Sequence, residues 1–451
     1  MTADPQLAAL GLFDARVPRY TSYPTAPQFG AAVGPEAFAG WIGAIPPGSQ
    51  ISLYLHVPFC RRLCWFCSCR TQGSPTDRPV LAYAETLAAE IAMIGRLLPE
   101  GVTLSRLHWG GGTPTMLPPA EIRALSRAIA AIAPMAPGAE FSVEIDPGEI
   151  DAPRLDALAE AGMNRASIGV QDFDEAIQKA IGRDQSFEIT AEVVAGLRAR
   201  GIASLNADIV YGLPHQTAER IAASVQKLLS LSPDRVALYG YAHVPWMSRR
   251  QQLIPSEAIP RAEERLDLFE VARALFDWDG FVPVGIDHFA RPADGLARAL
   301  AEGRLRRNFQ GYTDDAAPVL IGLGASAISR FPQGYAQNAA ATSDYARAIR
   351  EGRLAAARGH AFSGEDLLRG RMIEMLLCDF AIDRAGILRA FPQAQLRVDA
   401  LLSEAAARFG AMVALDAQGL SITHRGRPLA RMIARVFDGY NLSKAGHSSA
   451  V

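Results

Sequence analysis

Cysteine, lysine and long apolar stretches are scarce in this chain of 451 residues. It has only five cysteines, and of its 45 basic residues three are lysine and the other 42 are arginine. So few cysteines argue against a disulfide-stapled secreted scaffold. No apolar run is long enough to cross a bilayer. The first twenty residues lack the basic and apolar regions of a signal peptide, so we expect a cytoplasmic protein.

Charge and composition indicate an ordinary globular enzyme. The net charge of −2 gives no bulk attraction to nucleic acid. Hydrophobic residues make up 49% of the chain and charged residues 20%, and the length allows one large domain and a smaller one. The arginine excess has two readings, codon composition or guanidinium groups for a substrate with several carboxylates, and the sequence does not separate them.

Four of the five cysteines lie close together. Cys60, Cys64 and Cys67 form a C-x3-C-x2-C triplet, Cys69 follows as C-x-C, and Cys378 is more than 300 residues away. Such crowding in a cysteine-poor chain indicates a metal site, since disulfides at these spacings would close strained loops. Three thiolates on one loop can hold three irons of a 4Fe–4S cluster and leave the fourth open to a substrate.

Zinc is the alternative for this loop, with Cys69 or His56 as the fourth ligand. Zinc sites usually carry a second ligand pair far downstream. The sequence offers only the isolated Cys378 there, which has no close histidine, so spacing favours the cluster.

Strand and helix patterns alternate from residue 51 onward. The expected strands are 51–57, 104–109, 140–146, 165–170, 204–210 and 235–242, with helices such as 79–98, 119–132, 187–200 and 217–230 between them. Six such units in a row predict a parallel α/β sheet, either barrel-like or doubly wound. Two helices around the strand FVPVGID are expected in 257–302, and Gly-rich strands in 303–340. From about 360 the pattern turns helical, then ends in a short strand (418–422) and a last helix (427–437).

Polar residues and glycines follow several of these strands. Chemistry in parallel βα barrels gathers at the carboxyl ends of the strands, so these residues are expected on one face. They are Tyr54, Gly111, Gly112, Thr113, Glu144, Gln171, Asp208 and Ala242, with Arg183 in the loop after the fourth strand. Any single one could be a turn or cap residue, and their joint placement is the argument for a site.

Five segments carry a resemblance to a known family. They are PRYTSYPTAPQF (18–29), YLHVPFCRRLCWFCSC (54–69), LHWGGGTPT (107–115), DHFARP (287–292) and NFQGYT (308–313). The cysteine triplet resembles the radical S-adenosylmethionine (SAM) superfamily. The C-x-C extension, RYTSYP and FQGYT narrow the resemblance to the oxygen-independent coproporphyrinogen III oxidases. The likeness covers nearly the whole chain.

The resemblance implies a fold and a set of site residues. The fold is an α/β structure, an incomplete (β/α)6 radical SAM barrel at 51–340 with its extension. It is preceded by an N-terminal segment covering the active site (1–50) and followed by a small, mostly helical, winged-helix-like domain (341–451). Cys60, Cys64 and Cys67 would ligate the cluster, whereas Cys69 and Tyr54 are the candidate catalytic residues, Cys69 being essential without being a ligand. A first SAM is assigned to Tyr54, Gly111, Glu144 and Ile328, and a second to Phe66, Gly112, Thr113, Gln171, Arg183, Asp208 and Ala242.

The activity that the resemblance implies is oxidative decarboxylation. Two propionates of coproporphyrinogen III become vinyl groups, giving protoporphyrinogen IX in anaerobic haem biosynthesis, with one 4Fe–4S cluster and two SAM molecules. The family implies a monomer with a small-molecule tetrapyrrole substrate and an electron donor such as flavodoxin or ferredoxin. The charge and the lack of a long apolar run predict no nucleic-acid partner and no membrane span. The alternatives are a haem chaperone of the sister branch, which generally lacks RYTSYP and the C-x-C cysteine, and a tetrapyrrole methyltransferase.

The N-terminal PRYTSYPTAPQF segment is too rich in Tyr and Pro, and too poor in charge, for a solvated tail. Arg19, Tyr20 and Tyr23 offer one cation and two hydroxyls to a substrate with four carboxylates. The other reading is that the aromatic rings simply pack the segment against the barrel.

Overall fold

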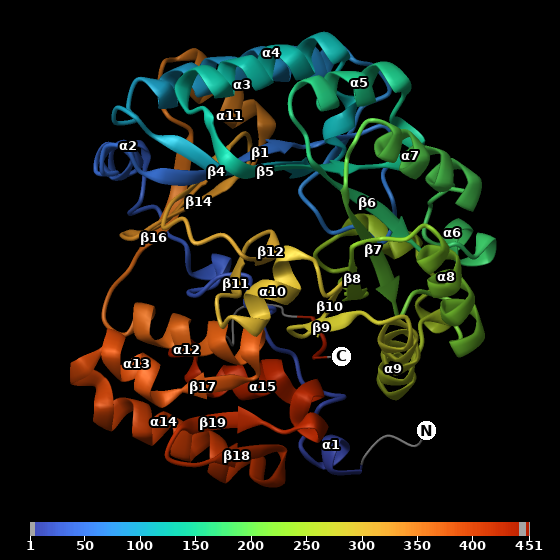
Figure 1. The fold of residues 1–451 in the computed structure, drawn as a ribbon, viewed down its shortest axis with the longest axis vertical. Helices are drawn as coiled ribbons and strands as arrows, with labels where there is room; N and C mark the ends of the chain where they lie inside the picture. The colour runs from blue at the N-terminus through green and yellow to red at the C-terminus, as the bar shows by residue number, and fades with distance from the viewer. Residues whose placement is uncertain (1–4, 442–447, 451) are drawn as a thin grey trace.

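Six parallel strands form the centre of the fold in the computed structural model, which describes residues 5–441 and 448–450 (Figure 1). They are β1 (Gln50–Val57), β4 (Thr103–Gly111), β5 (Met135–Ile145), β6 (Arg165–Gln171), β7 (Ser204–Tyr211) and β8 (Arg235–Gly240). The six strands expected from the sequence are confirmed, although β5 begins at Met135 rather than at residue 140.

The sheet extends beyond these six strands on both sides. Its order is β16–β15–β14–β13–β1–β4–β5–β6–β7–β8–β10–β9, and β1 pairs in parallel with both β4 and β13. The added strands are β9 (Val282–Val284), β10 (His288–Ala290), β13 (Leu320–Leu323), β14 (Ile328–Phe331), β15 (Gly334–Asn338) and β16 (Ala356–Ala361). Within the described residues β9 and β16 are the two edges and do not pair with each other, so the barrel is incomplete, as predicted.

Side-chain alternation along β1 separates the core from the site. Ile51, Leu53 and Leu55 are 0–1% exposed because they point to one face of the sheet, where the helices pack. Tyr54 and His56 therefore point to the other face, inside the barrel. Apolar residues on one face thus build the core, while the opposite face is left for chemistry.

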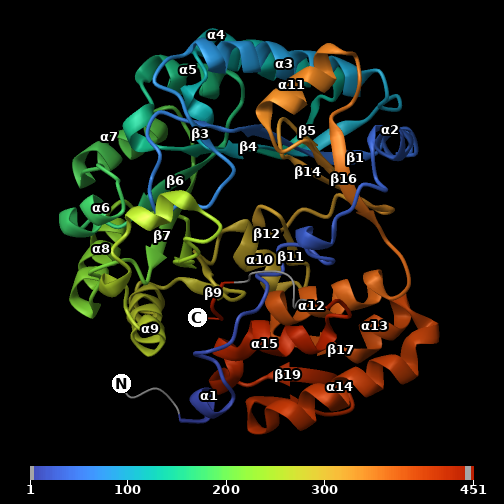
Figure 2. The same cartoon turned by 180° about the vertical axis from the view of Figure 1, so that it is seen from behind.

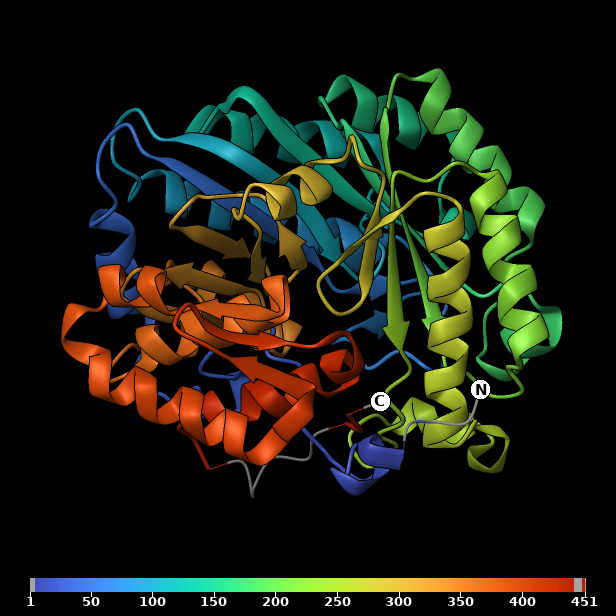
Figure 3. The same ribbon diagram turned by 60° about the horizontal axis from the view of Figure 1, so that its bottom comes forward.

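Helices cover the outer face of the sheet (Figures 2 and 3). They are α3 (Arg78–Gly95), α4 (Pro119–Ile132), α5 (Ala152–Glu160), α6 (Glu175–Ala180), α7 (Phe187–Ala199), α8 (Ala218–Ser230) and α9 (Ala262–Trp278). Polar caps fix several starts: Asp151, Asp174 and Ser186 each accept a hydrogen bond from the first turn of the helix that follows. None of the helices described is both long and apolar enough to cross a membrane.

The C-terminal part is a small helical domain with a three-stranded sheet, and its helical content was predicted. It contains α12 (Asp366–Asp379), α13 (Arg384–Ala390), α14 (Gln395–Phe409) and α15 (Ala430–Ala434), with β17 (Ala381–Asp383), β18 (Val413–Leu415) and β19 (Gly419–Ile422). The last helix expected over 427–437 is present, but as three short consecutive pieces. A 3-10 turn holds Pro428, which lacks an N–H to donate, and α15 spans only five residues before a second 3-10 turn begins.

The barrel sheet continues past the domain boundary expected at residue 340. The helix α11 (Thr342–Arg350) packs near α3, and β16 pairs with β15 as the edge of the large sheet. We therefore propose that the C-terminal domain begins after Ala361. At the other end of the chain, the N-terminal segment runs between the barrel and the C-terminal domain (Figure 2).

Glu90 of α3 ties this helix to the strand extension that carries Ile328. Its buried carboxylate accepts hydrogen bonds from the Tyr345 hydroxyl, the Gly324 N–H and the Asn338 amide, each at 2.7 Å. Burial raises the pKa of Glu90 to about 7, against the three hydrogen bonds that lower it.

This raised pKa predicts a pH-dependent stability. Between about pH 4.5 and about pH 7 the folded protein binds a proton at Glu90 that the unfolded chain does not, so stability falls as pH rises through this window. Glu90→Gln is expected to flatten that slope in thermal unfolding measured across the window. Glu85→Gln, on an exposed position of the same helix, is the control. Equal slopes for wild type and Glu90→Gln would contradict the assignment.

Candidate active site

The four clustered cysteines occupy a loop that follows β1. Cys60 ends the short strand β2 (Phe59–Cys60), which pairs with β3 (Gln72–Gly73), and this pairing closes the loop at its base. Cys60, Cys64 and Cys67 are free thiols and partly accessible, and Cys69 is exposed. The fifth, Cys378, is buried in α12, so it belongs to the core of the chain and not to the loop.

The thiols of the triplet differ in their acidity. Hydrogen bonds from the side chain and the backbone N–H of Cys69 lower the pKa of Cys67 to about 6, although burial opposes them. Burial raises the pKa of Cys60 to about 11 and also raises that of Cys64, where the guanidinium of Arg183 opposes it. Cys67 is thus already disposed toward the thiolate, the form that ligates metal, and a bound metal would deprotonate the other two.

The glycines after β4 bring the backbone against this loop. Gly111 has φ of +117°, and a Cβ there would lie 2.6 Å from the His56 ring. A Cβ at Gly112 would lie 2.5 Å from the Phe59 carbonyl oxygen and 3.0 Å from the Cys60 sulfur. Thr113 N–H donates to the same Phe59 carbonyl at 2.7 Å. Only glycine permits this close approach, so the turn is built around the position of the cysteine loop.

Glu144 and Tyr54 meet above this turn. The Gly111 N–H donates to Glu144 at 2.9 Å, and His108 lies 3.4 Å from the same carboxylate. Burial would raise the pKa of Glu144, but His108 and the Gly111 N–H keep it below its usual range. Tyr54 stacks on His108 with 5.6 Å between ring centroids, and its hydroxyl lies 2.9 Å from His56 Nδ1. This gives an ionised carboxylate beside the backbone of a glycine turn, a fit for an amino-acid moiety.

Ile328 reaches the same place from the other side of β1. Tyr54 pairs with Gly322 of β13, and a Cβ on Gly322 would lie 2.7 Å from the Ile328 carbonyl oxygen. The structure thus brings together the four residues assigned to the first SAM.

The strands that follow β5 carry further candidate residues. Gln171 ends β6, Asp208 lies in β7, and Arg183 lies in the loop between α6 and α7. Gln171 ends β6 in the left-handed region, with φ of +68°, a strained geometry that functional sites often hold. Arg183 donates to the Gly169 carbonyl at 2.7 Å and lies 3.4 Å from the Cys64 sulfur. Burial raises the pKa of Asp208 to about 6, while a 2.8 Å hydrogen bond from Asn206 opposes it.

The segment Arg249–Leu253 holds the cysteine loop in place. Gln251, 0% exposed, donates to the carbonyls of Phe66 at 2.7 Å and Ala242 at 3.0 Å. Arg250 donates to the Cys69 carbonyl at 3.0 Å. Gln251 thus joins two residues that are assigned to the second SAM. The arginines and glutamines of this segment resemble any exposed turn, so no sequence signal identifies it.

The three thiols of the triplet do not converge on a single point. No group of three or more His, Cys, Asp or Glu side chains in residues 5–441 and 448–450 is arranged to hold one metal ion. A 4Fe–4S cluster places its thiolates on different irons, so they need not converge on one point. The triplet and the close approach of Gly112 to Cys60 fit that larger group.

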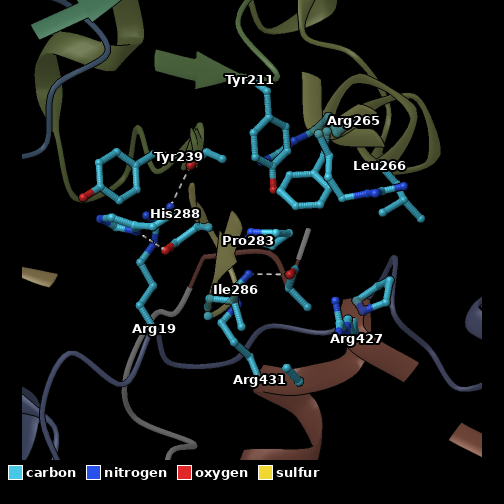
Figure 4. A pocket seen from close by; sticks show the side chains of 18 of the residues that line it. Arg19, Tyr211, Tyr239, Arg265, Leu266, Pro283, Ile286, His288, Arg427 and Arg431 are labelled. Atoms are coloured by element: carbon cyan, nitrogen blue, oxygen red, sulfur yellow. Dashed lines mark hydrogen bonds and ion pairs between the residues drawn. The ribbon is translucent and has the colours of Figure 1, made fainter. Parts of the chain in front are cut away.

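A cavity of about 720 Å³ opens beside the site, between the barrel, the N-terminal segment and the C-terminal domain (Figure 4). Cys69 lines it together with Arg19, Tyr239 and His288. Two residues of the NFQGYT motif, Phe309 and Gln310, also face it. The exposed cysteine next to the triplet therefore belongs to both the cluster loop and the cavity.

Comparisons with known proteins agree with this arrangement. The chain matches the radical SAM superfamily over residues 54–228. It is 64% identical to the oxygen-independent coproporphyrinogen III oxidase of Paracoccus denitrificans over 100% of both chains, and 37% identical to that of Escherichia coli over 98% of this chain and 97% of the other. The solved structure of the Escherichia coli coproporphyrinogen III oxidase, described as a radical SAM enzyme, superimposes with a TM-score of 0.91 and 36% identity, covering 97% of this chain and 99% of that one.

Proposed function

The chain belongs to the family of oxygen-independent coproporphyrinogen III oxidases within the radical SAM superfamily, and we propose from this premise that it decarboxylates coproporphyrinogen III. Two propionates become vinyl groups, giving protoporphyrinogen IX in anaerobic haem synthesis. One observation supports this function above the others. The cysteine triplet lies beside the residues at the strand ends, and the neighbouring Cys69 lines a cavity that is large enough for a tetrapyrrole.

We assign the cofactors to the residues that the site brings together. Cys60, Cys64 and Cys67 hold the 4Fe–4S cluster. When bound, the cluster and SAM supply the one-electron chemistry that removes a hydrogen atom from a propionate side chain. Tyr54, Gly111, Glu144 and Ile328 hold the SAM at the open iron. A second SAM lies against Phe66, Gly112, Thr113, Gln171, Arg183, Asp208 and Ala242.

The chain's own groups position and shield the reaction. The Glu144 carboxylate and the Gly111 backbone orient an amino-acid moiety. The loop with Gln251 closes one side of the cysteine loop, which keeps water from the reacting groups. Cys69 faces the cavity and contacts substrate without ligating iron.

An anaerobic assay tests the function directly. Reduced enzyme, SAM and coproporphyrinogen III are expected to release carbon dioxide and to yield protoporphyrin after oxidation. A methylated tetrapyrrole in place of carbon dioxide would make the chain a methyltransferase. Haem binding without turnover would make it a chaperone. We also propose that the enzyme is a cytoplasmic monomer reduced by a flavodoxin or ferredoxin.

Arg183→Ala tests the second SAM site. SAM titration of the reconstituted wild type is expected to show two sites, and Arg183→Ala should weaken one of them, since the guanidinium suits a carboxylate. Because Arg183 also lies 3.4 Å from the Cys64 sulfur, iron content is measured in parallel. Arg62→Ala, on the exposed side of the cysteine loop, is the control. A one-site isotherm that Arg183→Ala leaves unchanged would remove the second site.

A further inference from the structure

The large cavity carries an excess of positive charge. Seven arginines line it, against three acidic residues. Two of the three acids already have partners, since Glu270 pairs with Arg273 at 2.7 Å and Asp287 with His288 at 2.7 Å. A cavity with this balance attracts a ligand with several negative charges.

Four of these arginines have no carboxylate partner among the residues described: Arg19, Arg265, Arg307 and Arg431. They donate to backbone carbonyls instead. Arg265 donates to the Tyr241 carbonyl at 2.6 Å, and Arg431 donates to the carbonyls of Ser449 and Ala450. A carbonyl orients a guanidinium but leaves its charge uncompensated.

The side chains of Arg265 and Arg431 each contain a buried N–H group that has no hydrogen-bond partner among the described residues. Arg265 Nε and Arg431 Nη1 are shielded from solvent and make no hydrogen bond within residues 5–441 and 448–450. An unsatisfied buried donor is costly, and in the lining of a cavity a bound anion would satisfy it. Burial lowers the pKa of both arginines, that of Arg431 to about 10, and the charge of Arg19 lowers them further. A bound anion would relieve this repulsion.

The two arginines come from different parts of the fold. Arg265 is on α9 of the barrel and Arg431 on α15 of the C-terminal domain, and Figure 4 shows Pro283 and Ile286 between them. Apolar side chains thus line the cavity between the separated charges. That pattern matches a flat apolar macrocycle with carboxylates on its edge.

We propose that Arg265 and Arg431 bind carboxylates of the tetrapyrrole substrate, so that barrel and C-terminal domain hold it from two sides. This inference rests on the proposed function. It gives the C-terminal domain a part in substrate binding, through a residue far from the cysteine loop in sequence. It also assigns two of the 42 arginines a role that composition alone does not indicate.

Binding of coproporphyrin III, the stable oxidised form of the substrate, tests the proposal. Its tetramethyl ester keeps the ring and loses all four charges, so it is the matched probe. In an anaerobic fluorescence titration, Arg265→Gln and Arg431→Gln should each lower the affinity for the acid roughly ten- to a hundredfold. Neither substitution should change the affinity for the ester. Arg273→Gln, in the same cavity but already paired with Glu270 and Asp277, should leave the acid affinity unchanged.

Two results would overturn the proposal: an unchanged acid affinity in both variants, or an equal loss for acid and ester. The second would mean that the arginines only support the fold. Should Arg431→Gln fail to fold, because its side chain holds the C-terminal backbone, Arg265→Gln and Arg431→Lys decide the question. Arg431→Lys should lower the affinity for the acid by a smaller factor than Arg265→Gln does. A wild type that binds the acid but makes no protoporphyrin would instead refute the proposed function alone.

Discussion

Serine at Cys60, Cys64 or Cys67 is expected to remove bound iron and SAM cleavage together. A neutral hydroxyl is a poor iron ligand beside a thiolate, and each of the three thiolates holds a different iron, so none can replace another. Iron and sulfide content, the visible absorbance of the anaerobically reconstituted protein and the yield of 5′-deoxyadenosine should all fall to background. Cys378→Ser is the control, because that thiol is buried in α12 and lies outside the loop.

Cys69→Ser should behave differently, with the cluster kept and decarboxylation lost. The Cys69 N–H donates to the Cys67 sulfur at 3.4 Å, and serine keeps this backbone contact. What the substitution removes is a thiol that lines the cavity. Iron loss in Cys69→Ser equal to that of the triplet variants would make it a fourth ligand. A full cluster with SAM cleavage in any triplet variant would refute the triplet assignment.

The central sheet could be predicted because burial leaves a strong local signal. In β1 the apolar residues Ile51, Leu53, Leu55 and Val57 occupy alternate positions, and the structure buries all four. Parallel topology then fixes which ends of the strands meet. The apolar pattern of each strand and the rule that parallel strands end on one face were therefore enough to predict that Glu144, Gln171 and Asp208 lie on the same face.

Contacts between distant segments could not be predicted in the same way. Gln251 reaches Phe66 across 185 positions, and its neighbours read as an ordinary polar turn. Arg431 is next in sequence to Met432 and close to Ala434, which are both buried in the core of the C-terminal domain. Arg431 lines the cavity only because the C-terminal domain packs against the barrel, and the local sequence does not predict that packing.

Some residues of the N-terminal segment pack into the core of the C-terminal domain, and others line the cavity. The Tyr20 hydroxyl donates to Asp438 at 3.0 Å, and the Tyr23 hydroxyl accepts from the Gly439 N–H at 2.9 Å. Both rings are buried in the apolar core of the C-terminal domain. Their hydroxyls are thus used by the protein itself, whereas Arg19 lines the cavity. The expectation that both tyrosines offer hydroxyls to the substrate does not match these contacts.

Deleting residues 1–29 should therefore have two separable effects. Decarboxylation should fall sharply, because Arg19 and the wall that the segment forms are lost from the cavity. The thermal transition of the C-terminal domain should also fall, because Leu7, Leu12 and Val17 leave its core. Cluster content and substrate-independent SAM cleavage should largely survive, since the cysteine loop is held by β3 and the loop with Gln251.

Point variants distinguish the two roles within the same segment. Tyr20→Phe leaves the buried Asp438 short of a donor, which should cost about 1–3 kcal/mol of unfolding free energy and little activity per folded molecule. Arg19→Gln should do the opposite, raising KM for coproporphyrinogen III while the melting temperature stays near wild type. If Arg19→Gln and the deletion both turn over substrate with wild-type kinetics, the segment does not serve the active site. If Arg19→Gln lowers stability as much as Tyr20→Phe does, the whole segment is packing, and the cavity wall is formed by the barrel and the C-terminal domain.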